Sequence, residues 1–213
     1  MKRPRILLGD DHAIILDGLR RILEPHFEIV GTAEDGRALV AAAEKLRPDM
    51  VVADISMPLL NGIEAARQIR KAHPQAKVIF LTMHPDATYA TEAFRAGASG
   101  YVLKNSAASE LVTAIQEALK GRTYLTPRVA TDAIASWVRT PGQPAMPSAS
   151  LTSRQREILQ LVAEGRSAKD IATILRISPR TVEFHKYRIM EALGLRTTAE
   201  LTQYAIKHGI VSV

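Results

Sequence analysis

Charged and hydroxyl side chains follow four short apolar runs in the first half of the chain. Residues 5–9 run into Asp10 and Asp11, residues 50–53 into Asp54, residues 78–81 into Thr82, and residues 100–103 into Lys104. Short apolar runs bounded by turn residues are typical of buried strands. Because the carboxyl ends of parallel strands meet at one edge of a sheet, we expect these carboxylates, the hydroxyl and the ammonium to converge there.

This set of side chains suits phosphoryl-group chemistry. Neighbouring carboxylates repel one another unless a cation lies between them. The chain has no cysteine, and only His12 and His84 fall near these strand ends, so an oxygen-ligated ion such as Mg²⁺ is favoured. A carboxylate can itself accept a phosphoryl group, and Thr82 and Lys104 would then hydrogen-bond and neutralise that group. We therefore predict a phosphoryl acceptor at Asp54.

The residues between the apolar runs predict the sheet that holds these strand ends side by side. Ile15, Leu19, Ile22 and Leu23 have the spacing of one helix face, and comparable helical patterns separate the later runs. Residues 29–33 are predicted to form a further short strand, so residues 5–120 contain five strand–helix units. This alternation predicts an α/β fold with a doubly wound, five-stranded parallel sheet.

Length and composition limit the class of protein. A chain of 213 residues is long enough for two modest domains, each with its own core. The absence of cysteine excludes disulfides, cysteine-ligated zinc and a thiol nucleophile. No apolar run approaches the ~20 residues of a membrane span, and the N-terminal run is too short for a signal peptide. We expect a cytoplasmic protein without a membrane role.

A change in composition separates the two halves of the chain. After residue 122 we expect one short helix between Tyr124 and Trp137, with Pro127 in its first turn. Trp137 either anchors this helix to the first domain or fills apolar space. The stretch Thr140–Ser148 is rich in proline and serine, as linkers are. We therefore expect a first domain over residues 1–122, a linker over 123–150 and a second domain over 151–213.

Residues 151–213 read as four helices with well-marked ends. Capping boxes are expected at Thr152 with Gln155 and Thr197 with Glu200, N-caps at Ser167 and Ser178, and helix-ending glycines at Gly165, Gly194 and Gly209. A helix, a tight turn and a second capped helix match a helix-turn-helix. The segment holds 10 Lys and Arg against 6 Asp and Glu. That excess indicates a polyanion partner, although an ordinary solvated surface would also explain it.

The helix after Ser178 has one apolar and one polar face. Val182, Ile189 and Leu193 fall on the inward face, with His185 beside it. The outward-facing side chains fit contacts with base edges. Phe184 would contact a thymine methyl, Glu183 would accept from cytosine N4, and the arginines would bind guanine or phosphate. Burial under a neighbouring helix is the alternative for Phe184. The expected DNA-contacting set is Lys169, Arg180, Thr181, Glu183, Phe184, Lys186, Tyr187 and Arg188, in which Lys169 and Lys186 contact phosphates.

In order and spacing, Asp10-Asp11, Asp54, Met57-Pro58, Gly62, Thr82 and Lys104 resemble the receiver domain of two-component response regulators, over roughly residues 4–122. The resemblance implies that a sensor histidine kinase donates a phosphoryl group to Asp54. It implies that Asp11, Asp54 and the Ser56 carbonyl bind Mg²⁺, with Asp10 acting through water, and that Thr82 and Tyr101 form a switch pair. Lys104 is followed by Asn105 where many receivers have proline, which leaves the cis or trans state of that bond open.

Residues 151–211 resemble the LuxR-type helix-turn-helix of the NarL/FixJ subfamily. The residues that match are Leu151-Thr152, Arg154, Arg156-Glu157, Leu159, Ala163, Gly165, Ile171-Ala172, Ser178, Arg180-Thr181-Val182, His185 and Ala199-Glu200-Leu201. Many such regulators carry lysine at the position of Glu183, so the target sequence stays open. Both resemblances together imply a transcriptional regulator that binds double-stranded DNA, is not an enzyme, and forms a homodimer when phosphorylated. The alternatives are a phosphorelay intermediate without a DNA role and a haloacid-dehalogenase-like phosphatase, which typically shows Asp-x-Asp after its first strand.

Overall fold

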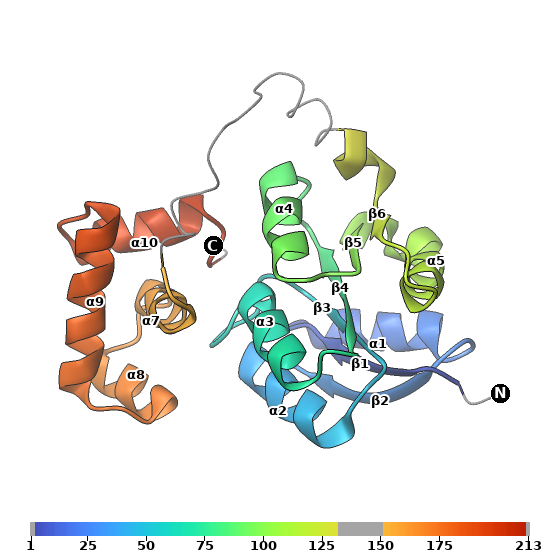
Figure 1. The fold of residues 1–213 in the computed structure, drawn as a ribbon, viewed down its shortest axis with the longest axis horizontal. Helices are drawn as coiled ribbons and strands as arrows, with labels where there is room; N and C mark the ends of the chain where they lie inside the picture. Colours follow the sequence, from blue (N-terminus) through green and yellow to red (C-terminus); the bar gives the residue numbers. More distant parts are fainter. Residues whose placement is uncertain (1–2, 132–150, 212–213) are drawn as a thin grey trace.

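A computed structural model describes residues 3–131 and 151–211 of the chain. It contains an α/β unit built on a parallel sheet and a separate helical unit (Figure 1). Among the described residues, no helix is long and apolar enough to cross a membrane. Trp137 and the proline-rich stretch Thr140–Ser148, on which two of our expectations fall, lie outside the described residues.

The sheet has six parallel strands in the order β2-β1-β3-β4-β5-β6. They span β1 Arg5–Gly9, β2 Glu28–Ala33, β3 Met50–Ala53, β4 Lys77–Thr82, β5 Gly100–Leu103 and β6 Tyr124–Leu125. The doubly wound parallel sheet is thus confirmed, and its first five strands are the predicted ones.

The edge strand β6 was not predicted. It extends the sheet past residue 122 into the segment where we expected the linker helix to begin. A strand of two residues is too short to show any alternation of polar and apolar side chains, which explains the error. Residues 127–131 are helical, so a helix does start at Pro127.

Helices cover both faces of the sheet (Figure 1). They span α1 Ala13–Leu23, α2 Gly36–Leu46, α3 Gly62–Ala72, α4 Ala87–Arg95 and α5 Ala107–Leu119. On one face, α1 and α5 bury Leu16, Leu19, Leu111 and Ile115 against the strands. On the other face, α2, α3 and α4 bury a second cluster that includes Leu39 and Ile69. The strand ends are therefore fixed between two packed layers.

The helical unit consists of α7 Ser153–Ala163, α8 Ala168–Leu175, α9 Pro179–Leu193 and α10 Thr198–Lys207 around a core of its own. The predicted ends are present. Thr152, Ser167 and Thr197 each begin a helix with a capping box, and Ser178 caps α9 with Pro179 in the first turn. Arg176 closes α8 in the left-handed conformation, so the turn between α8 and α9 is as tight as the helix-turn-helix prediction requires.

Candidate functional site

The strand register places the acidic residues side by side. Gly9 of β1 pairs with Ala53 of β3, so Asp10 and Asp54 leave adjacent strands at the same level. The Asp54 N–H donates to the Gly9 carbonyl at 2.8 Å. Asp10 is 1% exposed and Asp54 5%, whereas Asp11 is open to solvent. We call Asp10, Asp11 and Asp54 the acidic edge.

Lys104 joins two carboxylates of the acidic edge. Its Nζ lies 2.7 Å from Asp10 Oδ2 and 2.7 Å from Asp54 Oδ2. Burial by itself lowers the pKa of Lys104, but the hydrogen bonds with Asp10 and Asp54 outweigh it and raise the pKa. All peptide bonds among the described residues are trans, so the bond between Lys104 and Asn105, whose state the sequence left open, is trans. Lys104–Ser106 forms a 3-10 turn.

The donor set at the acidic edge suits a hard divalent cation. Asp10, Asp11 and His12 each offer a ligand atom within 4.8 Å of the others. The His12 ring Nδ1 lies 2.9 Å from Asp11 Oδ1 and 3.2 Å from Asp10 Oδ1, so the imidazole already contacts both carboxylates. A buried carboxylate beside a solvent-exposed one fits Mg²⁺, which prefers one or two carboxylates and retains waters.

The end of β4 connects the acidic edge to Tyr101. Thr82 is fully buried, and its Oγ1 accepts the His84 N–H at 3.3 Å. The buried Tyr101 hydroxyl donates to the His84 carbonyl at 2.7 Å, and burial raises its pKa. The His84 ring Nε2 lies 3.0 Å from Ser56 Oγ and the ring stacks on Tyr89, while burial lowers the His84 pKa. Thr82 and Tyr101 were expected here from the sequence, whereas the position of His84 between them was not.

The loop between β3 and α3 packs closely against the strand that carries Asp54. The Gly62 N–H donates to the Ile55 carbonyl at 2.8 Å. A Cβ at Gly62 would collide with the Asp54 backbone oxygen, which explains why glycine stands here. Asn61 begins α3 by accepting the Glu64 N–H through its side chain. The residues from Asp54 to Asn61 are therefore held at both ends by backbone hydrogen bonds and a helix cap.

A second site lies on the outer face of α9. Val182 and Ile189 are 1% exposed and pack inward with Leu193, as the helical wheel predicted. Phe184 is 60% exposed and Tyr187 66%, so the alternative of a buried Phe184 is wrong.

The charged residues expected at this face stand around those two aromatic rings. Arg180, Glu183 and Arg188 are exposed, Thr181 and Lys186 are half-buried, and Lys169 is exposed on α8. Lys186 Nζ lies 3.6 Å from Glu183 Oε2, and Arg188 pairs with Glu191 at 2.8 Å. Two exposed aromatic rings beside cationic side chains have the chemistry of a base- and phosphate-contacting surface.

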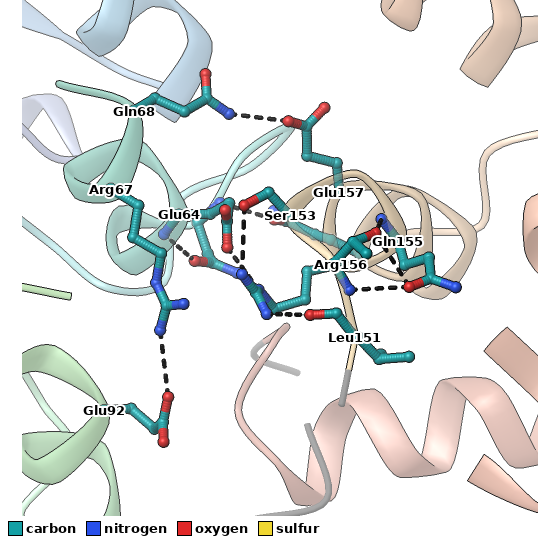
Figure 2. Close-up of polar contacts among 12 residues, drawn as sticks. Glu64, Arg67, Gln68, Glu92, Leu151, Ser153, Gln155, Arg156 and Glu157 are labelled. Carbon is teal, nitrogen blue, oxygen red and sulfur yellow. Dashed lines mark hydrogen bonds and ion pairs between the residues drawn. The ribbon is translucent and has the colours of Figure 1, made fainter. Parts of the chain in front are cut away.

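The α7 helix contacts the α/β unit through polar side chains (Figure 2). Arg156 Nε donates to the buried Glu64 of α3 at 2.7 Å. Glu157 accepts from Gln68 Nε2 at 2.8 Å and from Arg37 at 3.0 Å. We call these residues, with Gln160 and Glu164 described below, the interdomain contact.

The interdomain contact was not predicted from the sequence because its partners lie about half a chain apart. The available signal was the polar set Glu157, Gln160 and Glu164, which recurs on one side of α7 and its C-cap beside the apolar residues of the second half of the helix. Such a stripe is equally typical of a solvated helix face, so spacing alone does not distinguish the two.

Both units belong to known families. Residues 6–116 match the response regulator receiver domain, and residues 149–205 match the luxR family of bacterial regulatory proteins. The chain is therefore a transcriptional response regulator that combines a receiver domain with a LuxR-type DNA-binding domain, as the sequence analysis predicted.

Individual relatives share this two-domain organisation along their full length. The transcriptional regulatory protein MctR of Rhizobium johnstonii is 39% identical over 215 residues, which cover 99% of this chain and 98% of that protein. The RcsB response regulator of Salmonella typhimurium aligns with a TM-score of 0.65 and 29% identity, over 96% of this chain and 97% of that one. A structure of the RcsB–DNA complex aligns with a TM-score of 0.59 and 27% identity, over 95% of this chain and 98% of that one.

Proposed function

We propose that this response regulator accepts a phosphoryl group on Asp54 from the phosphohistidine of a sensor histidine kinase. The observation that carries this assignment is the Lys104 ammonium, which contacts Asp54 and Asp10 together at 2.7 Å. In the transfer, an Asp54 carboxylate oxygen forms the new O–P bond while the P–N bond to histidine breaks and the imidazole leaves with its electron pair. Lys104 and the Thr82 hydroxyl then offset and hydrogen-bond the charge of the transferred group.

Mg²⁺ is the proposed cofactor, held by Asp11, Asp54 and the Ser56 carbonyl, with Asp10 acting through water. When bound, the ion neutralises charge that builds up on the phosphoryl oxygens. The near-complete burial of Asp10 and Asp54 supports this, since two close buried carboxylates favour a cation. The switch pair is Thr82 and Tyr101, which are both hydrogen-bonded to the backbone of His84.

The proposed DNA surface is the outer face of α9 with Lys169 of α8, in the residues expected from the sequence. Phosphorylation would release the interdomain contact, so that two copies of the chain align their helix-turn-helix units on a two-fold operator as a homodimer. The exposure of Phe184 and Tyr187 supports a free DNA-facing surface. That RcsB dimers have been seen bound to DNA supports the dimer. We also propose a first domain that extends past the expected limit of residue 122 to include β6, and a second domain over residues 151–213. A cytoplasmic location and a role for Asp54 as a regulated acceptor without turnover complete the proposal.

The test is phosphorylation by acetyl phosphate with Mg²⁺, read by intact mass. Wild-type protein should gain ~80 Da, as expected for one phosphoryl group, and Asp54→Asn should gain none. Asp86→Asn serves as a matched control, since it alters another aspartate on the same domain and should leave the adduct in place. A stable adduct mapped to another residue would contradict the assignment.

A further inference from the structure

The loop from Asp54 to Asn61 is held by a side chain of the DNA-binding domain. Gln160 of α7 is 1% exposed and uses both atoms of its carboxamide on this loop. Its Nε2 donates to the Met57 carbonyl at 2.9 Å, and its Oε1 accepts the Asn61 N–H at 2.7 Å. One amide thus joins two points of the loop that carries the phosphoryl acceptor.

A second side chain fixes the orientation of that amide. Glu164 Oε1 accepts from Gln160 Nε2 at 2.8 Å and from the Leu59 N–H at 3.0 Å. Because the glutamate oxygen is only an acceptor, it selects the orientation in which Gln160 presents its NH₂ group to the Met57 carbonyl. Buried amides with all partners satisfied have one defined geometry, so the contact specifies the position of the loop.

Leu59 ties the loop to the DNA-binding domain in a different way. Its backbone has φ of +64°, a conformation that residues other than glycine seldom adopt. Its side chain packs against the hydrophobic core of the helical unit. An unfavourable backbone conformation persists when the surroundings over-determine it. Here the surroundings include the Glu164 hydrogen bond and the core of the other domain.

We propose that Gln160 is a positioning residue for the phosphoryl acceptor site, and that α7 holds the loop between β3 and α3 in the form that disfavours Mg²⁺ binding and phosphorylation. The direction rests on the proposed function, in which phosphorylation releases the interdomain contact. Coupling between two sites is reciprocal, so a contact that phosphorylation weakens must itself oppose phosphorylation. The loop carries the coupling because Ser56 and Asp54 lie within it and Gln160 binds it on both sides of Leu59.

The test compares full-length wild-type protein with Gln160→Met, Gln160→Glu and Gln68→Met. Methionine keeps the length of the side chain and removes both hydrogen bonds. Glutamate retains an acceptor for the Asn61 N–H but sets a second carboxylate against Glu164 and the Met57 carbonyl. The comparison variant Gln68→Met removes an interdomain hydrogen bond to Glu157 that does not touch the loop, so it weakens the domain contact without changing how the loop is held.

We expect both Gln160 variants to lower the dissociation constant for Mg²⁺, measured by calorimetry, by at least about fivefold, the lower end of typical allosteric coupling. The level of phosphorylation reached at a fixed acetyl phosphate concentration should rise in parallel, and Gln68→Met should shift both quantities by a clearly smaller factor than either Gln160 variant. Equal Mg²⁺ affinities in all four proteins would overturn the proposal, as would an equal shift in Gln68→Met. The calorimetry does not depend on which residue accepts phosphate, so the mapping of the adduct tests the proposed function separately.

Discussion

Replacing Lys104 with methionine removes the ammonium that contacts both buried carboxylates and keeps the length of the side chain. The Lys104 side chain is 10% exposed, Asp10 1% and Asp54 6%, so little water can take its place. Breaking a buried ion pair by removing one partner costs about 3–5 kcal/mol. The neighbouring Asp11 side chain is 32% exposed and admits solvent, so we expect the lower end, about 3 kcal/mol. For a domain of this size, that loss lowers Tm by roughly 10 °C.

Mg²⁺ should restore most of this loss, because a cation held by Asp11 and Asp54 would again offset the charge of the buried carboxylates. Binding at 100 times the dissociation constant stabilises the folded state by about 2.7 kcal/mol. Wild-type protein should gain less, since its lysine competes with the ion for Asp10 and Asp54. The raised pKa of Lys104 means that its contribution is fully present at neutral pH and is lost only as pH rises beyond the usual lysine range.

The assay is thermal unfolding by circular dichroism, in EDTA and in a Mg²⁺ series. Lys120→Met is the control, because its side chain is 58% exposed and its bond to Glu117 is a surface ion pair that should contribute little to stability and not respond to Mg²⁺. If Lys104→Met unfolds at the wild-type temperature in EDTA, or if its deficit is the same at all Mg²⁺ concentrations, the electrostatic account of the acidic edge is refuted.

Two further predictions concern the helical unit. Gly209→Ala should open the interdomain contact and raise the radius of gyration in X-ray scattering, because its Cβ would collide with Tyr89. The control is Gly194→Ala, which has a comparable positive φ but open space around it, so its radius of gyration should equal that of the wild type. Lys186→Ala should weaken binding to all duplexes and reduce the salt slope by about one unit, whereas Glu183→Ala should cost roughly 1–3 kcal/mol on the cognate site only. Fluorescence anisotropy on operator and scrambled DNA separates them, and the reverse pattern would contradict the assigned roles.

The sequence predicts the elements of this protein better than their contacts. Polar residues after apolar runs located four strand ends correctly, because a buried strand and its turn are local features. Helix caps at Ser167 and Ser178 were predictable for the same reason. The strand β6 was not predicted because two residues are too few to show the alternation of polar and apolar side chains that marks a strand.

The candidate site was predictable in membership but not in its connections. The strand ends indicate that Asp10, Asp54 and Lys104 converge, yet that one ammonium contacts both carboxylates depends on the register of four strands, β1, β3, β4 and β5. The bond from Gln160 to Met57 joins residues that are 103 positions apart. No periodicity within a helix specifies a partner at that distance, so such contacts come only from the packed structure.

The capping boxes of α7, α8 and α10 have a consequence for how fast the protein can respond. Each box joins residues three positions apart, so every one of these helix ends is specified within its own turn. Structures rich in such local contacts fold rapidly, and each cap contributes about 1 kcal/mol without help from distant residues. The helical unit can therefore leave the α/β unit as a preformed body. If phosphorylation releases it, as proposed, the release would be a rigid-body motion on the microsecond to millisecond scale, with no refolding step to delay the transcriptional response.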